Sequence, residues 1–393
     1  MKKSYLFAAL LAMGALSSCS NGTENVVPEQ SQNVEGRQPI LLGVGNPNPV
    51  AVTRGTGTVG DVGEELSVWN GEELYMLMVK KTDTSDLDYA KESGEYIFGN
   101  EAMNAPVGVN AGYMTLKPGV VTKYYPISGF FDFFAYHVDD AKAGEIDETD
   151  TQKWMLPFVI DGSQDLMVGK AELTEEQKEL MAAHGLSEEE SYGAKSARHG
   201  IVPSITFKHL LTRLNFTVKA GDPEARGNGV AENAVRVASI DIESKTTGKM
   251  VVAYKGTVAE ENLIEWANED KSRLTLKSRV GATLADLVDM EEVNLFDATE
   301  EGISAGEALL VAPEEEYMMN VVLKQMAVGA DTETTLTFKV PVKTTSGRGF
   351  QAGHSYNVSV TLYGMRRIDV HAVLTAWEKG EDISVFPEDE GVN

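Results

Sequence analysis

The feature that most constrains the fold of this chain is a long series of short apolar runs, each ended by Gly, Pro, Asp or Asn. Among them are "ELYMLMVK", "FFDFFAYHV", "YMMNVVLKQ" and "TLTFKVPVK", all rich in β-branched or aromatic residues. Such residues favour strands, and the turn residues between the runs favour tight reversals of the chain. Helical segments do not alternate with the runs, as they would in an α/β protein. The pattern predicts an all-β protein whose sheets pack face to face.

A chain of 393 residues is longer than one hydrophobic core usually serves, so we expect two domains. The least strand-like stretch contains one clear helix signal, "TEEQKELMAAHG". Thr174 is placed to cap this helix, Gln177 completes a capping box, and Gly185 fits its end. We therefore predict an N-terminal β-sandwich domain over 37–185 and a C-terminal one over 200–393.

Two further expectations concern the second half of the chain. In "SITFKHLLTRLNFTV", which we place in the second domain, four apolar residues inside the strands are predicted to be largely buried. They are Phe207, Leu214, Phe216 and Val218. The run "TLADLVDM" is predicted to form a short helix.

The first 18 residues have the form of a secretory signal. Lys2 and Lys3 precede the apolar run "YLFAALLAMGAL", which is too short to span a bilayer as a finished helix. "LSSC" follows and ends in Cys19, the single cysteine of the chain. This arrangement resembles a bacterial lipobox, which implies cleavage before Cys19 and a diacylglycerol on its sulfur. Several acyl chains make a stable membrane anchor. An ordinary signal peptide that ends near a cysteine is the alternative.

The charge of the chain excludes some classes of partner. The formal net charge is −26, and the signal contributes basic rather than acidic residues, so the acidity belongs to the exported body. Phosphate backbones and anionic lipid head groups are bound by basic surfaces, so we expect no nucleic-acid partner. With Cys19 acylated, no thiol remains for a disulfide or for catalysis.

The sequence offers no case for an enzyme, and we expect no cofactor and no metal. Gly302–Gly306 matches the G-x-S-x-G nucleophile elbow, but the buried strand that should precede the serine and the helix that should follow it are both missing. No two histidines have the spacing of a zinc motif, and His209 is predicted to be a packed, hydrogen-bonded core residue. The acidic run "DDAKAGEIDETD" lacks the spaced ligands of a calcium loop, which favours a solvated loop.

The N-terminal region of the exported chain contains a tether, a strand and a candidate cleavage site. Residues 19–36 are polar and without a hydrophobic period, which predicts a flexible tether. Ile40, Leu42 and Val44 then alternate, as in a half-buried strand. After a Pro-rich turn comes "AVTRGTG", in which Arg54 stands in soft, accessible backbone suited to proteolysis. A plain loop arginine is the alternative, and Arg37 is a weaker candidate because a cut there would retain the strand.

Several stretches resemble the fimbrillin-like lipoproteins of Gram-negative anaerobes. In chain order behind the lipobox they are "FFDFFAYHV", "QDLMVG", "ITFKHLLTRLNFTVKAG" and "RRIDVHAVLTAWEKG". The resemblance implies two transthyretin-like β-sandwich domains with few short helices, and a role as a subunit of type V pili. It implies that an outer-membrane lipoprotein is cut by an arginine-specific protease, here between Arg54 and Gly55. The first strand then leaves, and a strand from another pilus subunit takes its place.

The C-terminus leaves two interpretations open. In "IDVHAVL" the residues Ile368, Val370, Ala372 and Leu374 alternate, and in "EDISVF" Ile383 and Val385 do. Either segment could be the strand donated to a neighbour, or the last strand of the chain's own sandwich. A stalk subunit needs a donor strand, whereas a lipid-anchored tip or accessory adhesin binds a surface ligand without polymerising.

The lipobox yields the first testable prediction. Replacing Cys19→Ala removes the sulfur that would carry the lipid. We expect this variant to lose incorporation of labelled fatty acid and to stay unprocessed or become soluble, as measured by metabolic labelling and fractionation. Unchanged labelling of the variant would refute the lipoprotein assignment.

Overall fold

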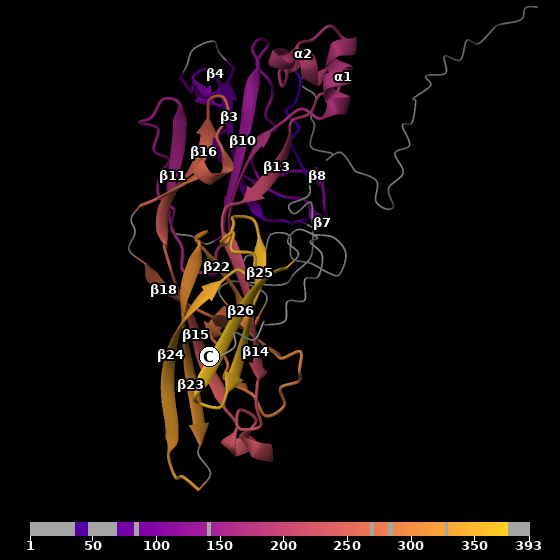
Figure 1. Ribbon diagram of the computed structural model, residues 1–393. Coiled ribbons are helices and arrows are strands. Elements are labelled where there is room, and N and C mark those ends of the chain that lie inside the picture. Colours follow the sequence, from indigo (N-terminus) through magenta and orange to yellow (C-terminus); the bar gives the residue numbers. More distant parts are fainter. Residues whose placement is uncertain are drawn as a thin grey trace, which may run out of the picture.

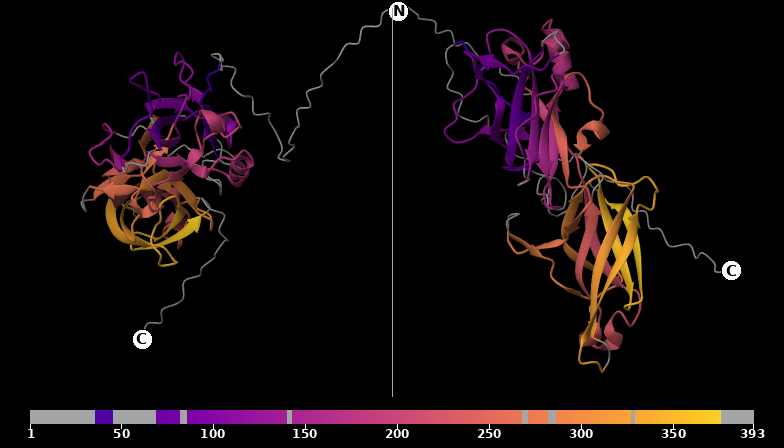
Figure 2. Two further views of the ribbon diagram at one scale, coloured as in Figure 1. Left: turned by 90° about the horizontal axis from the view of Figure 1, so that it is seen from above. Right: turned by 90° about the vertical axis from the view of Figure 1, so that its left-hand side faces the viewer.

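The computed structural model describes residues 36–45, 69–81, 86–139, 143–267, 271–281, 286–326 and 329–375. The chain is mostly β within these ranges, as the sequence predicts, and the strands form several sheets. Figures 1 and 2 show an elongated molecule in which earlier strands occupy one end and later strands the other.

The largest sheet among the described residues has eight strands. Its centre is built from the longest apolar runs of the first half of the chain, with β10 hydrogen-bonded to both β3 and β12. In spatial order its strands are β8 (Gly112–Tyr113), β1 (Gly43–Val44), β13 (Ser204–His209), β12 (Leu166–Ala171), β10 (Phe131–Val138), β3 (Glu73–Lys80), β6 (Gly99–Asn104) and β9 (Thr115–Leu116).

This sheet is buried on both faces. On β10, Phe133 points into a core that also holds residues of β1 and α1 (Glu175–Ala183). The next residue, Phe134, points to the opposite face, where a second core lies under a three-stranded sheet. That sheet consists of β11 (Lys153–Val159), β16 (Thr247–Tyr254) and β17 (Ile264–Trp266). Burial on both faces explains why the central strands are continuous apolar runs rather than alternating ones. We call these two sheets the first sheet pair.

Two further sheets enclose a separate core. Alternate residues of their strands, such as Leu214, Val237 and Val358, are fully buried between them. One sheet contains β22 (Ile303–Val311), β14 (Thr212–Ala220), β25 (Ser355–Tyr363) and β26 (Arg367–Thr375). The other contains β18 (Ser272–Thr275), β15 (Arg236–Ser244), β23 (Glu316–Met326) and β24 (Glu333–Lys343), with β21 (Val293–Asn294) also pairing with β15. We call them the second sheet pair.

The pairing of the strands does not follow the expected division into 37–185 and 200–393. The strand β13, which we placed with the second half, pairs with β12 and β1 in the first sheet pair. Similarly, β16 leaves the second sheet pair and forms seven pairs with β11. The chain turns from one sheet pair to the other at Leu210 and Leu211, between β13 and β14. Local patterning fixes which face of a strand is apolar, but not which distant sheet will cover that face.

The remaining elements are short and lie around the sheets. Two-stranded ribbons are formed by β2 (Trp69–Asn70) with β7 (Val107–Val109), β4 (Lys91–Glu92) with β5 (Glu95–Tyr96), and β19 (Lys277–Arg279) with β20 (Leu287–Asp289). The helix predicted over 283–290 is wrong in its described part, because β20 is a strand there. The other short helices are α2 (Ala194–Ala197), η1 (Glu188–Glu190), η2 (Gly227–Gly229), η3 (Ala231–Asn233) and η4 (Glu260–Asn262).

Helix α1 confirms the capping signals in the sequence. The Thr174 hydroxyl accepts a hydrogen bond from the Gln177 backbone N–H, and the Gln177 side chain accepts one from the Thr174 N–H. The chain leaves the helix through Gly185, whose φ of 65° suits glycine. Met181, on the inner face of the helix, is buried against the eight-stranded sheet.

The four residues predicted to be buried in "SITFKHLLTRLNFTV" are all buried, and Phe216 is 3% exposed. Replacing Phe216→Ala leaves a cavity in the core of the second sheet pair, so we expect the free energy of unfolding to fall by about 3–5 kcal/mol. The matched control is Ile127→Ala, because Ile127 is 96% exposed and its loss should change stability by less than about 0.5 kcal/mol. Urea unfolding midpoints measure both, and equal midpoints would contradict this packing.

Candidate functional site

The first described segment of the chain is inserted between two parts of the eight-stranded sheet. On one side, Gly43 and Val44 pair in parallel with Ser204 and Ile205 of β13. On the other side they pair antiparallel with β8, and the Met114 N–H donates to the Leu42 carbonyl at 2.8 Å. The segment is therefore an interior strand of the sheet, and both of its edges are satisfied.

The side chains of this segment also complete the core. Ile40, Leu42 and Val44 all lie in the core beneath α1, as their alternation predicts, and Leu42 is 1% exposed. Trp69, at the start of β2, is fully buried and donates its indole N–H to the Gly45 carbonyl at 2.8 Å. Trp69 was not singled out from the sequence; it lies two residues before Gly71, where a φ of 83° marks a change of chain direction.

Loss of this segment would leave a defined groove. The N–H groups of Met114, Tyr125 and the Trp69 indole would lose their acceptors, and the carbonyls of Lys123, Pro203 and Ile205 would lose their donors. Unpaired backbone groups beside an apolar trench are costly and favour the entry of another strand. An entering strand would need apolar side chains at alternate positions to match the three that leave.

Most of the candidate processing residues lie outside the described residues. Cys19, Arg54 and Gly55 belong to this group, so lipidation and cleavage stay predictions. Arg37 is described: it pairs with Glu92, and its guanidinium lies 5.0 Å from the centre of the Tyr124 ring. These contacts hold Arg37 against the surface, and cleavage at Arg37 stays a prediction.

The first C-terminal candidate is part of the chain's own sheet. Strand β26 pairs with β25 over nine residues, from Arg367 to Thr375. Ala372 is fully buried in the core of the second sheet pair, Ile368 and Val370 pack against that core, and Leu374 is 46% exposed. The second candidate, with Ile383 and Val385, lies outside the described residues.

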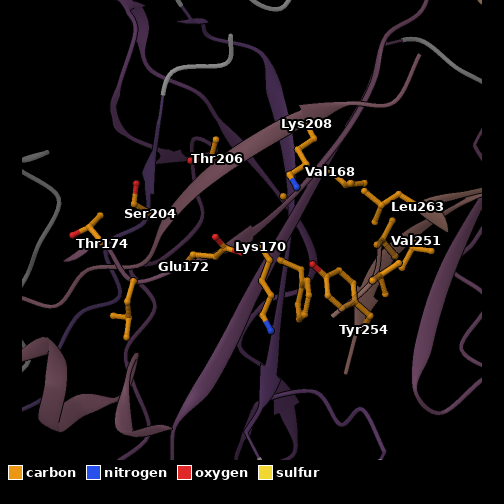
Figure 3. Close-up of a pocket in the computed structure, with 15 residues that line it drawn as sticks. Val168, Lys170, Glu172, Thr174, Ser204, Thr206, Lys208, Val251, Tyr254 and Leu263 are labelled. Atoms are coloured by element: carbon orange, nitrogen blue, oxygen red, sulfur yellow. The ribbon is translucent and has the colours of Figure 1, made fainter. Parts of the chain in front are cut away.

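A groove beside the three-stranded sheet is the next candidate (Figure 3). It has a volume of about 360 Å³ and lies between the polar residues of β12 and β13 and the apolar wall of β16. The Lys170 ammonium lies 5.2 Å from the centre of the Phe134 ring and 5.6 Å from that of Tyr254, and 3.5 Å from Asp132. Because this cation already covers both rings, the groove offers a ligand little free aromatic surface.

Two buried histidines meet acidic groups at the edge of the first sheet pair. His209 Nδ1 lies 2.6 Å from Asp165 Oδ2, which confirms His209 as a packed, hydrogen-bonded residue. His137 Nε2 lies 2.9 Å from Asp139 Oδ1, and its Nδ1 lies 2.8 Å from the Glu73 carbonyl. Burial lowers the pKa of His137, but the charge of Asp139 and these hydrogen bonds outweigh burial and raise the pKa to about 9.

The described residues place the other motifs in structural settings. Ser304 of the G-x-S-x-G match lies inside β22, opposite Thr217. The strand continues to Val311, where the nucleophile elbow would require a helix. In the acidic run, Asp147 binds Lys249 at 2.8 Å and Glu148 accepts from the Tyr89 hydroxyl at 2.9 Å. Across the described ranges, no three His, Cys, Asp or Glu side chains are grouped to hold a metal ion. No helix there is long and apolar enough to cross a membrane.

The model of one protein family matches residues 67–377 of the chain, which is most of its length, and its description is "Fimbrillin-like". The chain belongs to the fimbrillin-like family. This membership confirms the resemblance noted from the sequence and the expectation that the protein is not an enzyme. It also implies a location at the cell surface or in a fimbrium, with a role in adhesion or fimbria formation.

Solved structures of low sequence identity align with most of the chain. A candidate cell adhesion protein from Bacteroides uniformis is 15% identical with a TM-score of 0.47, covering 88% of this chain and 100% of its own. The fimbrial anchor protein Mfa2 from Porphyromonas gingivalis is 12% identical with a TM-score of 0.32, covering 84% and 97%. A fimbrial protein from Bacteroides ovatus is 12% identical with a TM-score of 0.30, covering 84% and 50%. No curated protein sequence matches the chain significantly.

The raised pKa of His137 predicts a pH dependence of stability. Because the folded-state value of about 9 exceeds the ordinary value of 6.5, the stabilising contribution is complete below pH 6.5 and is lost as pH rises through 9. We expect the urea midpoint of the native chain to fall across this window. The variant His137→Gln keeps a polar side chain without the charge, so the fall of its urea midpoint between pH 6.5 and 9 should be smaller. If the urea midpoints of the two proteins fall equally with pH, His137 is not the cause of the pH dependence.

Proposed function

We propose that this fimbrillin-like protein is a structural subunit of a type V-like pilus, assembled by exchange of its first strand. It is exported as a lipoprotein, anchored in the outer membrane through Cys19, and cut after Arg54 by an arginine-specific protease. Its partners are other pilus subunits, and the mature protein resides in the extracellular pilus. The two sheet pairs correspond, in this proposal, to two transthyretin-like β-sandwich domains.

The observation that supports the proposal most is the way the first segment is held. It joins the rest of the described structure through backbone hydrogen bonds on both edges and through three alternating side chains. Each buried aliphatic side chain contributes about 1.5–3 kcal/mol and each net hydrogen bond about 0.5–1.5 kcal/mol, so an incoming strand could recover most of what the outgoing one contributed. Cleavage after Arg54 would cut the only covalent link between this segment and Trp69.

The donor in this proposal is the segment that contains Ile383 and Val385. Ile383 and Val385 alternate, so their side chains could fill two of the three core positions that Ile40, Leu42 and Val44 occupy. The segment Ile368–Leu374 is a poorer donor, because its removal would empty the position of Ala372 and unpair β25.

The pairing of β26 also favours a second candidate function. If residues after β26 do not act as a donor, β26 is not a substitute among the described residues, because it completes its own sheet. The protein would then be a lipid-anchored tip or accessory adhesin that binds a surface ligand and does not polymerise.

Cleavage and assembly can be tested together. We expect an arginine-specific protease at low dose to cut the native precursor first after Arg54, which gives a product beginning at Gly55 by N-terminal sequencing. The cut protein should then form heat-sensitive polymers on semi-native gels, while uncut protein and Arg54→Ala stay monomeric.

A truncated chain separates the roles of the two ends. Deleting residues 381–393 should weaken polymerisation of the cut protein while its far-ultraviolet circular dichroism stays unchanged. A full-length cut protein that remains monomeric at high concentration would exclude the stalk subunit and leave the adhesin as the function.

A further inference from the structure

A cavity of about 520 Å³ lies where the two sheet pairs meet, and we call it the junction cleft. Its apolar wall comes from Ile264 and Trp266 of β17, Leu210 of the turn between the sheet pairs, and Pro313 after β22. Small-molecule sites are typically apolar cavities of this size at such junctions, with a few polar groups that orient the ligand. The cleft belongs neither to the first-strand groove nor to the groove of Figure 3.

Trp266 is held in a fixed position at this wall. Its backbone pairs with Gly248 of β16, and its ring meets that of Phe158 edge to face, with centroids 5.4 Å apart at 88°. A Cβ on Gly248 would lie 2.9 Å from the Glu265 carbonyl and 3.0 Å from the Phe158 ring, so only glycine permits this close approach. The indole is half-buried and lines the cleft.

Polar groups of three kinds complete the cleft. Glu260 and Glu261 of the turn η4 supply carboxylates, and the Lys208 ammonium fixes Glu260 at 2.5 Å. Gln351 supplies an amide from a loop that is itself anchored, because its N–H donates to the Tyr356 hydroxyl at 3.1 Å and its carbonyl accepts from Thr212 at 2.8 Å. His354 Nδ1 donates to the Ala352 carbonyl at 2.8 Å, which orients the imidazole.

These groups select the chemistry of the ligand. No Lys or Arg is among the described residues that line the cleft, which disfavours an anion. The described edge strand β17 has three residues, too few to act as a template for a peptide strand. Sugars combine an apolar C–H face, which suits an indole, with hydroxyls, which carboxylates, amides and imidazoles bind.

We propose that the junction cleft binds a neutral oligosaccharide, with Trp266 as the platform for one sugar ring and Glu261 and Gln351 as partners for its hydroxyls. Lys208 acts as a positioning residue through Glu260. The residues that line the cleft belong neither to the first segment nor to its neighbours β8 and β13, so the cleft is separate from the site of strand exchange. Lys208 lies on β13 and acts only through Glu260.

The test is binding of the purified full-length chain, kept in detergent, to a printed array of neutral, sialylated and sulfated oligosaccharides. We expect signals on neutral glycans. For the strongest of them, Trp266→Ala should weaken binding at least tenfold in titration calorimetry. Tyr254→Ala, which alters the groove of Figure 3, is the matched control and should bind as the native chain does.

A second variant keeps the test valid if Trp266→Ala perturbs the fold. Glu261→Gln removes one charge at an exposed side chain and should weaken binding severalfold without changing the urea midpoint. The proposal is overturned if the native chain binds no neutral glycan, if it prefers the acidic ones, or if both variants bind as the native chain does. Polymer formation is read out separately, so either proposal can fail without the other.

Discussion

Burial of the eight-stranded sheet on both faces is the constraint on which the rest of the structure depends. Strands β3, β10 and β12 bury apolar side chains on each side, so the sheet must be covered twice. The helix α1 covers part of one face, and the three-stranded sheet covers the other. The first segment lies within this doubly covered sheet, between β8 and β13.

The same constraint explains the route of the chain. Of the strands in the three-stranded sheet, only β11 comes from the first half of the sequence. The hairpin of β16 and β17 must therefore return from the second half, and this return creates the junction cleft beside the turn at Leu210. A cavity between the sheet pairs is a consequence of how the first sheet pair is completed.

The sequence predicted local features well because their causes are local. The cap at Thr174, the alternation of Ile40, Leu42 and Val44, and the burial of Phe216 all follow from side-chain periodicity or short-range hydrogen bonds. The position of β13 did not follow, because its alternation fits any sheet with an open edge. The run "TLADLVDM" was misjudged because short apolar segments do not separate helix from strand, and in β20 the pairing with β19 decides.

The parallel pairing of two strands has a mechanical consequence. Strand β1 pairs in parallel with β13, which continues through two residues into β14, and β14 pairs in parallel with β25, the neighbour of β26. Strands β13, β14, β25 and β26 run roughly along the long axis of the molecule (Figure 1). Tension applied between the first and last strands is therefore carried along the strand axes, where the hydrogen bonds of each ladder share the load and must break together. Resistance to such a pull depends on the rate of forced unfolding rather than on the equilibrium stability of the chain.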